Sequence, residues 1–278
     1  MAETQQVSSA PYISDEEWCE AIVANIGQSA EWNGIALPGY PSKETQSRTT
    51  FLGASESMMR GAFQLYKHVK DACAQHGSPI DSRTQILDFG CGWGRIARFF
   101  LKDMSLQNIH GVDVLSELTA SCNETFCSNN FEQIEQKGTI PHATASFDVV
   151  FANSVFSHLD EQLNMRWINE IHRVLKPNGL AVLTVIDQKK YESMLNNNSE
   201  WMAKLGADTA ETRDELYAGN LVWRTTNRQN ELEGYGLTFI PVQWIRDKWG
   251  HLFDLKEVRD NYSQCVLVLT KKQALHGE

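Results

Sequence analysis

The stretch from Gln85 to Phe100, QILDFGCGWGRIARFF, restricts the fold of this chain more than any other. A short, mostly apolar run from Ile86 to Phe89 predicts a buried strand, and apolar residues return at helical spacing from Ile96 to Leu101. Three alternate glycines lie between them and predict a tight turn, whose backbone a ligand can approach at the positive end of the following helix. Strand, glycine turn and helix together predict a nucleotide-binding α/β unit.

The spacing of these glycines bears on the choice between two ligands. A dinucleotide motif, G-x-G-x-x-G, counted from Gly90 and Gly92 needs a glycine at position 95, where the chain has Arg95. This departure argues against NAD. With Asp88 two residues earlier and Gly94 at the end, the segment resembles the E/D-x-G-x-G-x-G motif of class I S-adenosylmethionine-dependent methyltransferases. An ordinary turn in another α/β protein is the alternative, so the rest of the chain has to decide.

The composition of the 278 residues limits the class of protein and its partners. No apolar run reaches the roughly 18 residues of a membrane span, and the N-terminus lacks the features of a signal peptide, so we expect a cytoplasmic protein that does not contact a membrane. The net charge of −10 argues against a nucleic-acid partner. The six cysteines show neither a C-x-x-C pair nor a zinc-type spacing, which predicts reduced thiols and no metal site.

The segments downstream of the glycines follow the order of a doubly wound sheet. Apolar runs predict strands, and amphipathic or capped segments between them predict helices. The predicted strands are 108–112, 131–134, 147–152, 180–186, 253–259 and 264–270, the last two as a hairpin, and the predicted helices are 116–126, 160–175 and 241–249.

The order FDVV, a polar strand end, a helix, RVLKPNG and a buried strand resembles the second half of the same methyltransferase family. The resemblance implies an α/β, Rossmann-like, doubly wound seven-stranded sheet, mostly parallel, with an antiparallel last strand. The strings GCGWGR and SVFSHL are similar to bacterial small-molecule and sugar methyltransferases of this class.

Two regions are predicted outside the core of this fold. Residues 1–80 form an N-terminal helical flank or lid, in which Ser14 and Glu17 make a capping box and a second helix runs from Met58 to Lys70. Residues 81–278 form the methyltransferase domain. Within it, an insertion at about 187–240 carries several aromatic residues and is predicted to be a cap.

Asp113 is the first candidate ligand of the cofactor. It ends the strand at 108–112, roughly 20 residues beyond the glycines, where a carboxylate can accept hydrogen bonds from both hydroxyls of a ribose. Its alternative role is to cap the helix at 116–126. The ribose role is favoured because the chain has both the glycine turn and, at this distance from it, Asp113.

The methyltransferase resemblance implies S-adenosylmethionine as the cofactor. Many members place an acidic residue on the adenine amino group near the third strand, whereas this chain offers only polar and aromatic residues there, among them Asn130 and Phe131. The cofactor-binding set that we predict is Asp88, Gly90, Cys91, Gly92, Gly94, Asp113, Val114, Asn130, Phe131, Ala152 and Asn153.

His158 is the candidate general base, because it follows the strand at 147–152 and an imidazole near its ordinary pKa suits proton removal. The alternative is that it only orients its loop. Arg95 either pairs with a carboxylate or lies on the helix surface. The predicted substrate contacts are Trp93, Ser157, Tyr217 and Trp223.

These features predict methyl transfer to a small-molecule acceptor, with O-methylation favoured over N-methylation, by a monomer or homodimer. The sequence NSVF (153–156) lacks both prolines of the N/D-P-P-Y/F motif of nucleic-acid amino-methylating enzymes, which also argues against a nucleic-acid acceptor. A non-catalytic cofactor-binding protein is the main alternative, and an NAD-binding oxidoreductase is a weaker one.

Overall fold

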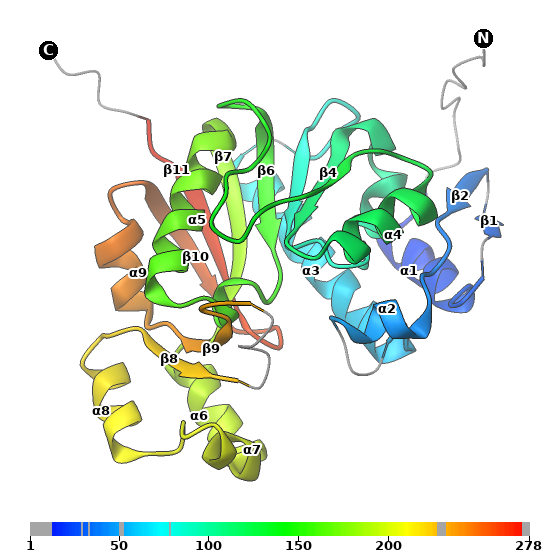
Figure 1. Ribbon diagram of the computed structural model, residues 1–278. Helices are drawn as coiled ribbons and strands as arrows, with labels where there is room; N and C mark the ends of the chain where they lie inside the picture. The colour runs from blue at the N-terminus through cyan, green and yellow to red at the C-terminus, as the bar shows by residue number, and fades with distance from the viewer. Residues whose placement is uncertain are drawn as a thin grey trace, which may run out of the picture.

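The computed structural model describes residues 13–28, 30–32, 34–49, 53–77, 79–226 and 232–273. A seven-stranded sheet forms its centre, in the order β10-β11-β7-β6-β3-β4-β5 (Figure 1). Strands β3 to β7 pair in parallel, and β11 lies antiparallel between β7 and β10, which confirms the predicted sheet. The bounds are β3 Ile86–Phe89, β4 Ile109–Asp113, β5 Phe131–Gln133, β6 Phe147–Ala152, β7 Leu175–Val185, β10 Phe253–Arg259 and β11 Cys265–Lys271. No helix among the described residues has the length and apolar character that crossing a membrane requires.

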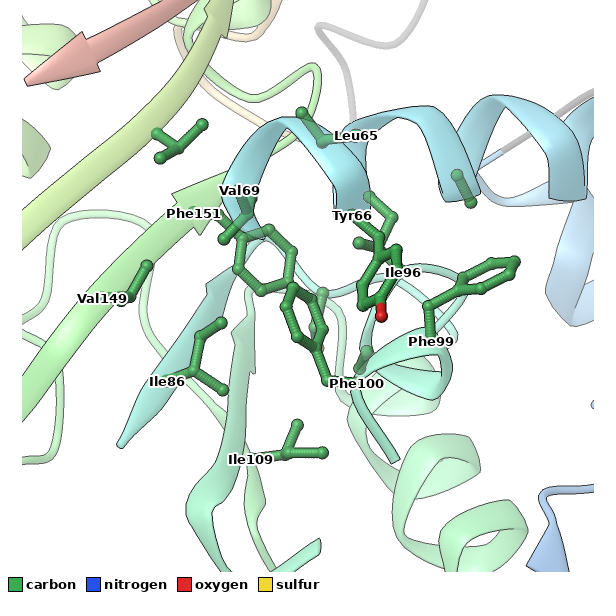
Figure 2. Close-up of a cluster of buried hydrophobic side chains, with 14 of the residues drawn as sticks. Leu65, Tyr66, Val69, Ile86, Ile96, Phe99, Phe100, Ile109, Val149 and Phe151 are labelled. Atoms are coloured by element: carbon green, nitrogen blue, oxygen red, sulfur yellow. The ribbon is translucent and has the colours of Figure 1, made fainter. Parts of the chain in front are cut away.

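Helices cover both faces of the sheet, which is why its central strands are apolar on both sides. On one face lie α1 (Asp15–Ala24), α3 (Glu56–His76), the 3₁₀ helix η1 (Ala97–Lys102) and α4 (Ser116–Phe126). On the other lie α5 (Glu161–Val174) and α9 (Val242–Trp249). Figure 2 shows the first of these cores, where side chains of α3 and η1 meet the strands. The labelled residues are Leu65, Tyr66, Val69, Ile86, Ile96, Phe99, Phe100, Ile109, Val149 and Phe151.

The N-terminal helices pack directly against this sheet. The predicted capping box is present at the start of α1, where Ser14 and Glu17 bond each other's backbone N–H. The Tyr66 hydroxyl of α3 lies 3.0 Å from Asp15 Oδ1 and 2.5 Å from Asp103 Oδ2, and it can donate its one proton to either carboxylate, so it links α1, α3 and the end of η1. The described helices α1 and α3 of this N-terminal region therefore share a core with the strands.

Three local features differ from the sequence predictions. The Pro- and Gly-rich stretch 34–53, for which no helix or strand was predicted, contains α2 (Lys43–Ser47) and β2 (Ile35–Leu37), which pairs with β1 (Ala30–Trp32). The helix after the glycines is only the six-residue η1, so it lacks the aligned dipoles of a long α-helix. Strand β7 begins at Leu175 rather than at residue 180, because Leu175 already pairs with Phe147.

The insertion forms a compact unit below the sheet in Figure 1. It contains α6 (Gln188–Asn197), α7 (Ser199–Lys204), α8 (Ala210–Tyr217) and the antiparallel pair β8 (Val222–Thr225) and β9 (Gly236–Phe239). Its buried residues, Tyr191 and Leu216 among them, form a cluster separate from the two cores of the sheet. Its two ends meet, because Ile186 bridges Phe239 and accepts a hydrogen bond from Ile240 N at 2.8 Å.

Candidate active site

A cavity of about 490 Å³ lies where three central strands end, and this volume is typical of small-molecule sites. Gly90 directly follows β3, Asp113 ends β4, and Asn153 directly follows β6, and all three line the cavity. Strand β3 lies between β4 and β6, so the order of the strands reverses there. Ligands of open α/β sheets bind at such a reversal, outside the carboxyl ends of the strands.

The glycine loop is held against β4 by its own backbone. The N–H groups of Gly90 and Cys91 both donate to the Val112 carbonyl, at 2.8 and 3.0 Å. Gly90 has a φ of +78°, a left-handed value that glycine adopts without strain, and a Cβ there would lie 2.3 Å from Val155 Cγ2. Glycine at this position thus lets the loop lie flat along the cavity wall.

Asp113 is oriented by the loop that it faces. Its Oδ2 accepts from Gly92 N at 2.9 Å, and its Oδ1 accepts from Leu115 N at 3.0 Å. Burial raises the pKa of the carboxyl, while these backbone N–H groups act to lower it. Leu115 is the N-cap residue of α4 and has no side-chain cap bond, so Asp113 is not the cap. The remaining lone pairs of the carboxylate are available for ribose hydroxyls.

Five residues of the predicted cofactor set do not line this cavity. Phe131 and Ala152 are core residues, and a Cβ at Gly94 would lie 2.6 Å from Phe126, so this glycine serves helix packing. The side chain of Asn130 donates to two backbone carbonyls before and within β4. Asp88 is buried behind the loop, and burial together with the charge of Asp113 raises the pKa of its carboxyl well above the ordinary value. The members that do line the cavity are Gly90, Cys91, Gly92, Asp113, Val114 and Asn153.

Of the predicted substrate contacts, the structure brings only Trp93 to the cavity wall, and its side chain is almost fully buried. Ser157 is fully buried, and its hydroxyl lies 3.3 Å from that of Ser154. Tyr217 is 59% exposed on the outer surface of the cap and donates to Glu192. Trp223 lies in β8 and does not line the cavity.

Sequence analysis missed several residues of the cavity wall. Ile134 and Gln136 follow β5 and line the cavity, whereas the predicted contacts Asn130 and Phe131 lie at the start of that strand. Since parallel strands present their carboxyl ends to a ligand, the first residues after β5 carried the useful signal. Tyr262 and Gln264 come from the loop between β10 and β11, far away in the sequence.

His158 lies in the short 3₁₀ segment after β6 and lines the same cavity. Its Nδ1 lies 2.7 Å from the Gly236 carbonyl oxygen, and its ring stacks on Tyr235 with centroids 4.8 Å apart. Its Nε2 lies 3.3 Å from Ser154 Oγ, and Ser154 Oγ accepts a hydrogen bond from Gln264 Nε2 at 2.8 Å. Tyr235 and Gly236 of the cap and Gln264 of the terminal hairpin therefore position the turn after β6.

Ser154 has a φ of +58°, an uncommon backbone conformation for a residue with a side chain. Its N–H donates to Thr184 Oγ1 at 2.7 Å, which holds this conformation in place. Strained residues of this kind cluster at functional sites, where the surrounding structure compensates for the strain. Among the described residues, no group of three or more His, Cys, Asp or Glu side chains is arranged to hold a metal ion.

The fold and the glycine cavity define a class of protein, and comparison with known proteins agrees with it. A family model described as "Methyltransferase domain" matches residues 86–179, about a third of the chain. Malonyl-(acyl-carrier protein) O-methyltransferase of Halalkalibacterium halodurans is 26% identical over 151 residues, which cover 52% of this chain and 55% of that protein. Probable methyltransferase ltbC of Aspergillus luteorubrus is 26% identical over 193 residues, covering 65% and 60%. The chain thus spans about half the length of the curated relatives it matches.

Solved structures show the same fold. Burkholderia thailandensis 1,6-didemethyltoxoflavin-N1-methyltransferase aligns over 96% of this chain and 94% of its own with a TM-score of 0.53 and 13% identity. A methyltransferase from Methanosarcina mazei aligns over 69% and 93%, with a TM-score of 0.50 and 19% identity. The match to the family model over residues 86–179 shows that the chain carries a class I S-adenosylmethionine-dependent methyltransferase domain, and these solved structures share its fold.

The residues present fit the cofactor of this family, S-adenosylmethionine. The loop at Gly90 and Gly92 exposes backbone to the cavity, and Asp113 directs a carboxylate with free lone pairs into it. Gln136 donates through Nε2 to the Glu233 carbonyl, which leaves its Oε1 as an acceptor for an amino group at the adenine end. The family match decides between the two cofactors considered from the sequence in favour of the sulfonium compound.

Proposed function

We propose that the protein methylates a hydroxyl group of a small-molecule acceptor and that His158 is the general base. The observation that supports this most strongly is the contact between His158 Nδ1 and the Gly236 carbonyl. A carbonyl oxygen can only accept, so Nδ1 carries a proton, and in the neutral form of the ring the lone pair lies on Nε2, which faces Ser154 Oγ at 3.3 Å. Because His158 also lines the cavity, a base is held beside the space for the acceptor.

The cofactor supplies an already activated methyl group, so the protein has to align the acceptor and exclude water. A hydroxyl oxygen becomes a good nucleophile only when its proton is removed, whereas a neutral amine can lose its proton after transfer. A base in the cavity therefore favours O-methylation. The O-methyltransferase name of one curated relative is consistent with this proposal, but that relative is distant.

The small size of the acceptor is supported by the volume of the cavity, which the cofactor has to share. The net charge of −10 also disfavours a polyanionic substrate. We retain a monomer or homodimer, a cytoplasmic location, and the division into a flank at 1–80 and a domain at 81–278 with a cap as predictions from the sequence.

The test is a screen of paired hydroxyl and amine acceptors with labelled S-adenosylmethionine, read by mass spectrometry of the products. With an acceptor in hand, His158→Ala should slow turnover on the order of 100-fold and leave S-adenosylhomocysteine affinity nearly unchanged. His251→Ala, at an exposed histidine, is the matched control. Full activity of His158→Ala would reduce His158 to a structural role. Cofactor binding without turnover of any acceptor would favour the non-catalytic alternative.

A further inference from the structure

Arg95 occupies the position at which a dinucleotide motif would have its third glycine. It lies in the wall of the cavity and is only partly exposed. Its Nη1 donates to the Met58 carbonyl at 2.9 Å, and this is the one hydrogen bond of its guanidinium within the described ranges. A guanidinium carries five N–H donors in a planar fork, so most of them remain for a ligand.

The charge of Arg95 has no carboxylate partner within ion-pair distance in the part of the chain that the structure describes. Burial lowers the pKa of the guanidinium, while the nearby Tyr262 and Asp88 act to raise it. An arginine nevertheless stays charged, and a charge withdrawn from water is unfavourable unless an anion pairs with it. A negatively charged group of a ligand in the cavity would therefore stabilise the guanidinium.

The position of Arg95 along the glycine loop identifies that group. Gly92 donates to Asp113, the predicted ribose ligand. Arg95 follows Gly92 by three residues, so their Cα atoms are at most about 11 Å apart. Asp113 and Arg95 line the same cavity, so a ligand that fills this cavity meets both side chains. S-Adenosylmethionine carries its carboxylate on the amino-acid chain, at the end opposite the adenine.

We propose that Arg95 binds the carboxylate of the cofactor's amino-acid chain and so fixes that end of the molecule. The planar fork suits two parallel hydrogen bonds to a carboxylate, which a lysine cannot reproduce. Met58 O holds Nη1 and thereby orients the fork before the ligand arrives. This inference rests on the cofactor of the family and not on the acceptor or on His158.

The test is calorimetric binding of three ligands to Arg95→Gln. S-Adenosylhomocysteine has the carboxylate, its decarboxylated analogue keeps only the ammonium group, and 5′-methylthioadenosine lacks both. We expect the variant to bind S-adenosylhomocysteine about 30-fold or more weakly and the other two ligands within about twofold of the wild type. Retained binding of 5′-methylthioadenosine also shows that the variant is folded.

Two further variants sharpen this test. Arg95→Lys should keep part of the affinity, because it retains the charge but loses the fork. Arg83→Gln, at a side chain 89% exposed, should bind all three ligands as the wild type does. Unchanged S-adenosylhomocysteine affinity in Arg95→Gln would overturn the proposal and leave Arg95 for an acceptor carboxylate. An equal loss for all three ligands would overturn it as well, since the effect would then come from the shape of the loop.

Discussion

Replacing Gly90 with alanine tests whether the glycine loop needs both its backbone conformation and its empty Cβ position. At a φ of +78° a side chain costs about 1–2 kcal/mol. The new Cβ would also lie 2.3 Å from Val155 Cγ2, an overpacking that typically costs about 1–3 kcal/mol. We therefore expect Gly90→Ala to lower the free energy of unfolding by about 2–5 kcal/mol, a large share of the stability of an ordinary domain.

A second substitution separates the two contributions. Val155→Ala removes the methyl group that the new Cβ meets, so in the Gly90→Ala background it should restore about 1–3 kcal/mol. The backbone contribution should remain in the double variant. In the wild-type background, Val155→Ala only removes packing and should be mildly destabilising.

The measurement is urea unfolding of all four proteins, followed by tryptophan fluorescence, with S-adenosylhomocysteine affinity measured by calorimetry. Because Gly90 lines the cavity, affinity should fall together with stability in Gly90→Ala. Strictly additive stabilities would refute the contact with Val155. A free energy of unfolding for Gly90→Ala within about 0.5 kcal/mol of the wild type would refute the whole argument.

Two other predictions concern single carboxylates. Asp113→Ala should weaken S-adenosylhomocysteine binding by about 1–3 kcal/mol through lost charge-assisted hydrogen bonds, and unchanged affinity in calorimetry would contradict the ribose assignment. Although burial alone would raise the pKa of Asp15, hydrogen bonds from Lys102 and Lys70 lower it to about 2. Its stabilisation, about 1–2 kcal/mol, is thus complete above pH 4 and disappears as pH falls through 2. Urea unfolding across this range should show a shallower pH dependence for Asp15→Asn than for the wild type, and equal slopes would contradict it.

The fold was predictable because its strands correspond to short apolar runs in the sequence that have clear ends. The run FDVVFA at 147–152 matches β6 residue for residue, and β10 coincides with the predicted 253–259. The short pair β1 and β2 was missed because it lies in a Pro- and Gly-rich stretch and has only three residues per strand. Periodicity needs more residues than that to become visible.

The site was predictable at positions where a residue of suitable chemistry lies at the carboxyl end of a strand. Gly90 and Asp113 follow strands directly, so the carboxyl edge of the sheet brings them together. Tyr262 and Gln264 were not found, because only the antiparallel return of β11 places their loop beside Asn153 and Ser154. No local pattern encodes a contact between residues more than 100 positions apart.

The meeting of the two ends of the cap at Ile186 and Ile240 makes the cap a module. A segment that leaves and rejoins a sheet at one point can change in length at a small entropic cost, since loop closure depends only weakly on the number of residues. The strands of the sheet on either side of the cap, β7 and β10, both pair with β11 and not with the cap. Because the carbonyls of Glu233 and Gly236 in the cap contact Gln136 and His158 of the cavity wall, a cap exchanged at this junction has to keep these two contacts.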